Sequence, residues 1–71
     1  MRKNIVGSKI KEYRMQHGLT QAQLSKKMID NGVHMDQKIL SQIEINTRCV
    51  YDYELVAFIK IFNVNIEDLL E

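Results

Sequence analysis

The 71-residue sequence contains no proline, no tryptophan, three glycines and one cysteine, Cys49. So few chain-breaking residues disfavour a turn-rich β fold and favour helices. A single cysteine excludes an internal disulfide and agrees with a reducing compartment. The sequence has neither a signal-peptide pattern nor a run of about 18 apolar residues, so we expect a cytoplasmic protein.

The residue types that catalyse reactions or bind metals are few and scattered. No Cys or His lies at metal-ligand spacing, and the sequence shows neither a nucleophile–base pair nor a phosphate-binding glycine loop. We therefore predict no enzyme, no metal and no cofactor. Apolar residues make up 45% of the chain, enough for one small core, so residues 1–71 are predicted to form a single domain.

The charges are distributed unevenly along the chain. Residues 1–48 contain nine Lys or Arg and four Asp or Glu, a net charge of +5, whereas residues 49–71 contain one and five, a net charge of −4. The two parts sum to the formal net charge of +1. A basic front and an acidic tail suit a domain that presents one side to a polyanion.

The first two predicted helices are separated by clear end signals. The first covers about residues 4–17. Thr20 and, three residues later, Gln23 have the spacing of a capping box, which predicts the start of a second helix. The pair Asn31-Gly32 is typical of a turn and ends that helix.

Similar signals predict the remaining helices. Asp36 caps a third helix, which Asn46 ends, and Asp52 caps a fourth, which Asn63 ends. Asn65 caps a short last helix. The sequence therefore predicts an all-α fold, a compact bundle of four to five helices in which the second and third form a helix-turn-helix.

The predicted third helix has one apolar and one polar face. At about 100° per residue, Leu40 and Ile43 share the inner face with Glu44. Polar side chains lie on the outer side: Gln37, Lys38, Ser41 and Gln42. Such a face is often only solvated, but Gln, Lys and Ser are also the side chains that contact base edges in the major groove. The short helix before it favours the second interpretation, because a helix-turn-helix places its second helix in that groove.

Two segments resemble the phage-repressor and Cro-like helix-turn-helix family, also called XRE: GLTQAQLS at residues 18–25 and ILSQIE at residues 39–44. The match continues at apolar positions with the spacing of that family's last two helices: Leu55, Phe58, Phe62, Val64, Ile66 and Leu69. It covers roughly residues 6–70. The resemblance implies a lambda-repressor-like DNA-binding domain.

The same resemblance implies roles for individual residues. It implies base contacts from four of them: Gln37, Lys38, Ser41 and Gln42. It implies phosphate contacts from three more: Gln21, Asn46 and Arg48. It also implies a structural ion pair between Arg14 and Glu44. One feature departs from the family pattern: Gln21 and Asp36 are 15 residues apart, a longer separation than the family usually has. The angle of the third helix can change with this separation.

We therefore expect a sequence-specific DNA-binding transcriptional regulator, a repressor that occupies its operator. One recognition helix reads few base pairs, so a homodimer on double-stranded DNA with an inverted-repeat operator is expected. The candidate interface positions are apolar and C-terminal: Ile61, Ile66 and Leu70. The alternative is an antitoxin or antirepressor that holds a partner protein with the same bundle. Neither interpretation requires a membrane or a small-molecule substrate.

Overall fold

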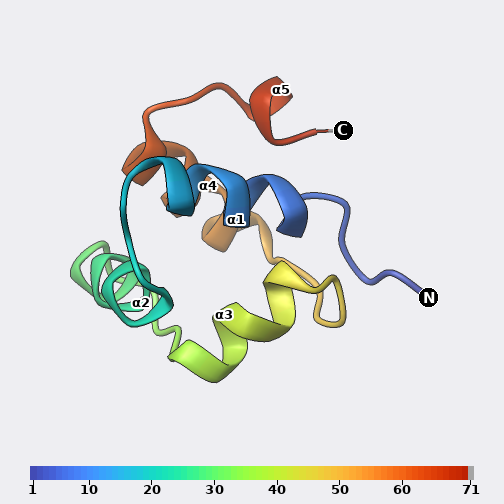
Figure 1. The fold of residues 1–71 in the computed structure, drawn as a ribbon, viewed down its shortest axis with the longest axis horizontal. Coiled ribbons are helices and arrows are strands. Elements are labelled where there is room, and N and C mark those ends of the chain that lie inside the picture. The colour runs from blue at the N-terminus through green and yellow to red at the C-terminus, as the bar shows by residue number, and fades with distance from the viewer. Residues whose placement is uncertain (71) are drawn as a thin grey trace.

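The structure, a computed structural model, describes residues 1–70. Its five helices are α1 (Gly7–Gln16), α2 (Gln21–Asp30), α3 (Gln37–Glu44), α4 (Asp52–Phe62) and α5 (Ile66–Leu69), and no strand occurs in these residues. In Figure 1, α1 and α4 lie in the middle of the molecule, α5 lies above them, α3 beneath, and α2 to one side. The predicted all-α bundle is confirmed.

The starts of α2 and α3 agree with the sequence patterns. Thr20 Oγ1 accepts a hydrogen bond from Gln23 N at 3.1 Å, and Gln23 Oε1 accepts one from Thr20 N at 2.8 Å. Asp36 Oδ1 accepts from Ile39 N at 2.8 Å. Each cap satisfies N–H groups that have no partner within the helix. Because capping depends on residues three apart, the sequence was sufficient to predict it.

Two other helix starts differ from the prediction. The first helix begins at Gly7, because Asn4 lies outside it and its Oδ1 accepts from Val6 N at 3.0 Å and Gly7 N at 2.7 Å. The fourth begins one residue earlier than expected, with Asp52 already helical, and Glu54 Oε1 accepts from the preceding Tyr51 N at 2.9 Å. A carboxylate inside the first turn thus replaces the expected aspartate cap.

The core lies between α1, α4 and the helix-turn-helix. Its largest fully buried apolar side chains come from every helix and from the link before α3: Ile10, Leu24, Met28, Met35, Leu40, Ile43, Phe58 and Leu69. Rings of Phe58 and Phe62 stack at 6.2 Å, and Tyr13 stacks on Phe62 at 5.8 Å. No helix within residues 1–70 combines the length and apolar character needed to span a membrane.

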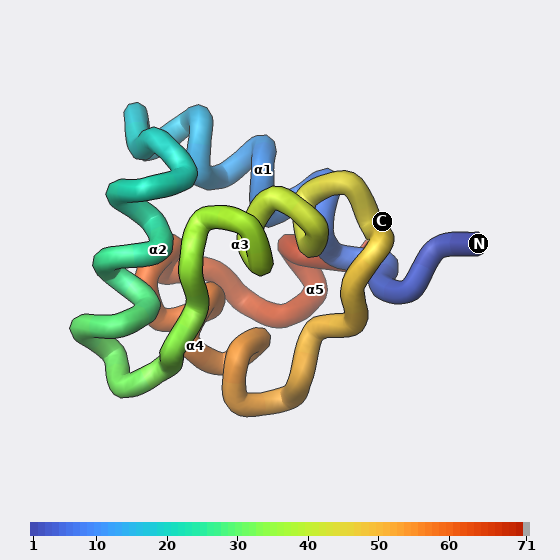
Figure 2. The backbone as a smooth tube through the Cα atoms, turned by 90° about the horizontal axis from the view of Figure 1, so that it is seen from below, coloured from blue at the N-terminus to red at the C-terminus, as the bar shows by residue number. Residues whose placement is uncertain are grey.

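The long link between α2 and α3 is anchored to the core. Val33 and Met35 are buried, whereas His34 between them is exposed. Val33 N donates to Met28 O at 2.9 Å, and Gly32 takes a left-handed φ of 81° that turns the chain after α2. The additional residues therefore form an extended, core-anchored segment, and α2 and α3 still pack against each other (Figure 2).

Candidate nucleic-acid interface

Helix α3 lies at the surface with one side against the bundle. It forms the lower edge of the molecule in Figure 1 and lies in front of the other helices when seen from below in Figure 2. Leu40 and Ile43 are fully buried. On the outer side Gln37 and Lys38 are exposed and Ser41 and Gln42 are half-buried. The structure thus brings the four expected base-contacting residues together on one helix face.

The polar atoms of this face are available to a ligand. Among residues 1–70, no hydrogen bond or ion pair engages the side chains of Gln37, Lys38, Ser41 or Gln42. The apolar Ile45, at the end of the same face, is 64% exposed. Amide, ammonium and hydroxyl groups with an apolar neighbour provide the chemistry that distinguishes base pairs in the major groove.

A buried ion pair fixes the inner side of α3 to α1. Arg14 Nε lies 2.7 Å from Glu44 Oε2, and Arg14 Nη2 donates to Glu44 Oε1 at 3.1 Å. The side chains are 12% and 2% exposed, respectively. Arg14 Nη1 also donates to Leu19 O at 2.8 Å, in the turn before α2. These are the two side chains that the family resemblance pairs.

Gln21, at the start of α2, is the first of the three residues implied to contact phosphate. Its Nε2 donates to Glu44 Oε1 at 3.1 Å, so Glu44 is shared between α1 and α2. One hydrogen on that amide nitrogen is left for a further acceptor. The side chain therefore ties α2 to α3 in addition to facing the surface, where it is half-buried.

Asn46, the second of these residues, is turned toward the start of the chain. It has a left-handed φ of 66°, and its Nδ2 donates to Asn4 Oδ1 at 2.9 Å. Asn4 Nδ2 in turn donates to Ile43 O at 3.0 Å and Arg48 O at 2.8 Å. The backbones approach closely here, since a Cβ on Gly7 would lie 2.0 Å from Ile43 O.

Arg48, the third, is engaged with α4. Its Nη1 and Nη2 donate to the two carboxylate oxygens of Glu54 at 2.8 and 3.1 Å, and Nη1 also donates to Cys49 O at 2.9 Å. Its guanidinium lies 5.1 Å from the centre of the Tyr51 ring. The hydrogen bond with Glu54 raises the pKa of Arg48 above its ordinary value, so the arginine is charged throughout the accessible pH range.

Sequence reasoning missed the structural roles of Asn4 and Glu54. Asn4 joins the N-terminal segment to the last turn of α3, and Glu54, 1% exposed, anchors the loop between α3 and α4. A glutamate at the third position of a helix is a known capping signal, from which the bond between Tyr51 N and Glu54 could have been predicted. Nothing in the local sequence indicated the long-range bonds of Asn4, whose Nδ2 donates to carbonyl oxygens 39 and 44 residues away.

Comparisons with known proteins agree with this geometry. A family model described as helix-turn-helix matches residues 10–69. The crystal structure of the DNA-binding domain of BldD superposes with a TM-score of 0.76 at 18% identity, covering 99% of this chain and 94% of that one. The S. venezulae BldD DNA-binding domain gives 0.73 at 20% identity, covering 93% and 91%. At these identities the two structures show a shared fold. No curated protein matches the chain.

Proposed function

This chain belongs to the XRE-type helix-turn-helix family of DNA-binding transcriptional regulators, and we propose that it is a sequence-specific repressor whose helix α3 reads the major groove. The observation that carries the proposal is the contrast between the two sides of α3. The outer polar groups have no partner among residues 1–70, while the inner side is held by Leu40, Ile43 and the Glu44 ion pair. A rigid helix with unengaged polar groups is what base reading requires.

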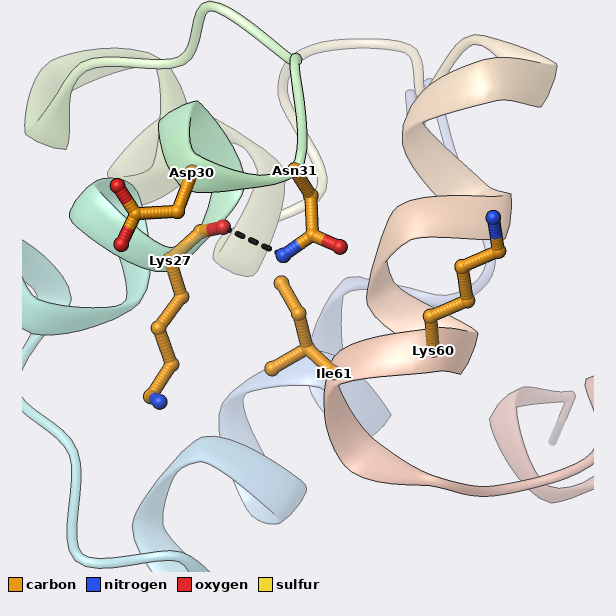
Figure 3. Close-up of a pocket in the computed structure, with 5 residues that line it drawn as sticks. All are labelled: Lys27, Asp30, Asn31, Lys60 and Ile61. Atoms are coloured by element: carbon orange, nitrogen blue, oxygen red, sulfur yellow. Dashed lines mark hydrogen bonds between the residues drawn. The ribbon is translucent and has the colours of Figure 1, made fainter.

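Repression would follow from occupancy of the operator, and a homodimer on an inverted repeat would supply enough base contacts. Exposed apolar side chains near the C-terminus support a dimer: Ile66 is 47% and Leu70 is 42% exposed. Ile61 is half-buried and faces a hollow of about 240 Å³ beside Asn31 and Lys60 (Figure 3), so we assign it a smaller share of the interface.

Selection of bound sequences from a random DNA pool tests the proposal. We expect a palindromic consensus, since two α3 helices related by a two-fold axis would read the same half-site. A pool that yields no enriched sequence would contradict sequence-specific binding.

The residues are tested by Gln37→Ala and Gln42→Ala. Each should weaken binding to the selected site by about 1–3 kcal/mol, roughly 10- to 100-fold, and affect random DNA much less, because base contacts carry discrimination. Gln16→Ala on α1, an exposed glutamine outside α3, is the matched control and should change neither affinity. Equal losses on both DNAs would reassign the two residues to the DNA backbone.

The second candidate function is an antitoxin or antirepressor module that binds a partner protein. It is favoured by Tyr53 and Val56, two exposed apolar side chains one turn apart on α4. Salt dependence separates the two functions. Binding to DNA falls steeply as the salt concentration rises because counterions are released, whereas binding through apolar burial does not.

A further inference from the structure

We propose that Lys3 is a phosphate-contacting residue, held beside the C-terminal end of α3 by an asparagine clamp. We define the asparagine clamp as Asn4 and Asn46 with the hydrogen bonds that they form. This inference rests on the proposed DNA binding by α3 and adds a contact to it. Lys3 lies before the family match, which starts at residue 10. The sequence patterns do not assign this part of the chain to the interface either.

The need for a further cation follows from the observed side chains. The three residues implied to contact phosphate all form internal hydrogen bonds: Gln21 with Glu44, Asn46 with Asn4, and Arg48 with Glu54. On the outer face of α3 the charged group is Lys38, close to the N-terminal end of the helix. Affinity for DNA depends mainly on cations that neutralise phosphates, so a second cation near the other end of α3 would add substantially to binding.

The backbone places Lys3 at that other end. Lys3 N donates to Asn46 O at 2.8 Å, and Asn46 directly follows the exposed Ile45. Helix α3 has eight residues and is about 12 Å long, so Lys38 and Lys3 lie near its opposite ends. We therefore expect the two lysines to contact different phosphates. In Figure 1 the N-terminal segment runs downward, toward the side of the molecule that carries α3.

The clamp makes this placement specific. Asn4 Nδ2 donates to two carbonyl oxygens, of Ile43 and Arg48, while its Oδ1 accepts from the backbone at the start of α1. The close approach of Gly7 to Ile43 O leaves no space for a side chain between the two segments. The backbone before α1 is therefore fixed against α3, and the exposed side chain of Lys3 extends from a defined position.

Lys3→Gln tests the inference without disturbing the fold, because Lys3 is joined to Asn46 through its main-chain nitrogen, which the variant retains. The affinity of the full chain for the selected duplex and for a random duplex is measured at several salt concentrations. We expect similar losses of affinity on both DNAs. In a plot of log K against log salt concentration, the magnitude of the slope should decrease by about 0.9 for each lost contact, or by about 1.8 for a dimer.

Lys60→Gln is the matched control. Lys60 is an exposed lysine on α4 that lines the hollow of Figure 3, to which α3 contributes no lining residue, and its replacement should leave the slope unchanged. An unchanged slope for Lys3→Gln, with the unmodified chain still binding in a salt-dependent way, would overturn this inference alone. Failure of the unmodified chain to bind any DNA would overturn both this inference and the proposed function.

Discussion

Two arginine–glutamate pairs within residues 1–70, Arg14–Glu44 and Arg48–Glu54, have nearly the same local chemistry and different roles. In both, the glutamate side chain is 2% exposed and accepts two hydrogen bonds from the guanidinium. Arg14 and Glu44 are 30 residues apart and join α1 to α3, whereas Arg48 and Glu54 are six apart and join the loop after α3 to the first turn of α4. One pair orients a helix, and the other shapes a loop.

The additional partners of the two glutamates reinforce this difference. Glu44 also accepts from Gln21, so its carboxylate collects donors from α1 and α2. Glu54 accepts from the adjacent backbone at Tyr51 N. Loss of the Glu44 pair should therefore affect the whole bundle, and loss of the Glu54 pair mainly the loop. How strongly a buried ion pair stabilises this fold therefore depends on the elements that it joins.

The largest effect is expected from Arg14→Ala. Removing the guanidinium leaves the buried Glu44 carboxylate without its charge partner, which should lower the free energy of unfolding by about 3–5 kcal/mol. Urea unfolding of the variant measures this loss. The double variant Arg14→Ala/Glu44→Ala should recover part of it, because no unpaired carboxylate is then buried. An unchanged unfolding midpoint for Arg14→Ala would refute the structural role of the pair.

A smaller effect is expected from Arg48→Ala. Its side chain is 23% exposed, against 12% for Arg14, so water can partly solvate Glu54 after the change, and Tyr51 N still donates to that carboxylate. We expect a loss of about 2 kcal/mol in the free energy of unfolding. Arg48→Lys, which retains the charge without the two-pronged geometry, should lose less. If Arg48→Ala proved as destabilising as Arg14→Ala, the distinction between the two pairs would fail.

The sequence predicted features that depend on residues close together in the chain. The Thr20 capping box and the Asp36 cap rest on a spacing of three residues, and the outer face of α3 follows from helical periodicity alone. The pairing of Arg14 with Glu44 required the family resemblance, since no local pattern connects residues 30 apart.

The asparagine clamp and the Arg48–Glu54 pair show where such reasoning stops. Asn4 Nδ2 reaches the carbonyl oxygens of Ile43 and Arg48 only after α1 and α3 have packed. The direction of the Arg48 side chain is decided by a buried carboxylate on α4. The family resemblance implied that Asn46 and Arg48 contact phosphate, and their internal hydrogen bonds were not visible in the sequence. Burial and tertiary packing, rather than residue type, determine which polar groups are engaged.

The smallest change in stability is expected from Gln21→Ala, which separates the helix-joining role of this residue from phosphate binding. Glu44 would lose a neutral donor at 3.1 Å and keep both hydrogen bonds from Arg14, so the free energy of unfolding should fall by about 1 kcal/mol.

DNA binding by Gln21→Ala should weaken by a similar factor on selected and random duplexes, because the second hydrogen of the Gln21 amide is expected to contact a phosphate. Since glutamine is uncharged, the salt slope should not change, unlike that of Lys3→Gln. Gln16→Ala again serves as the control. A loss confined to the selected duplex would instead mean that Gln21 acts by holding α3 at its reading angle, through the same carboxylate that Arg14 binds.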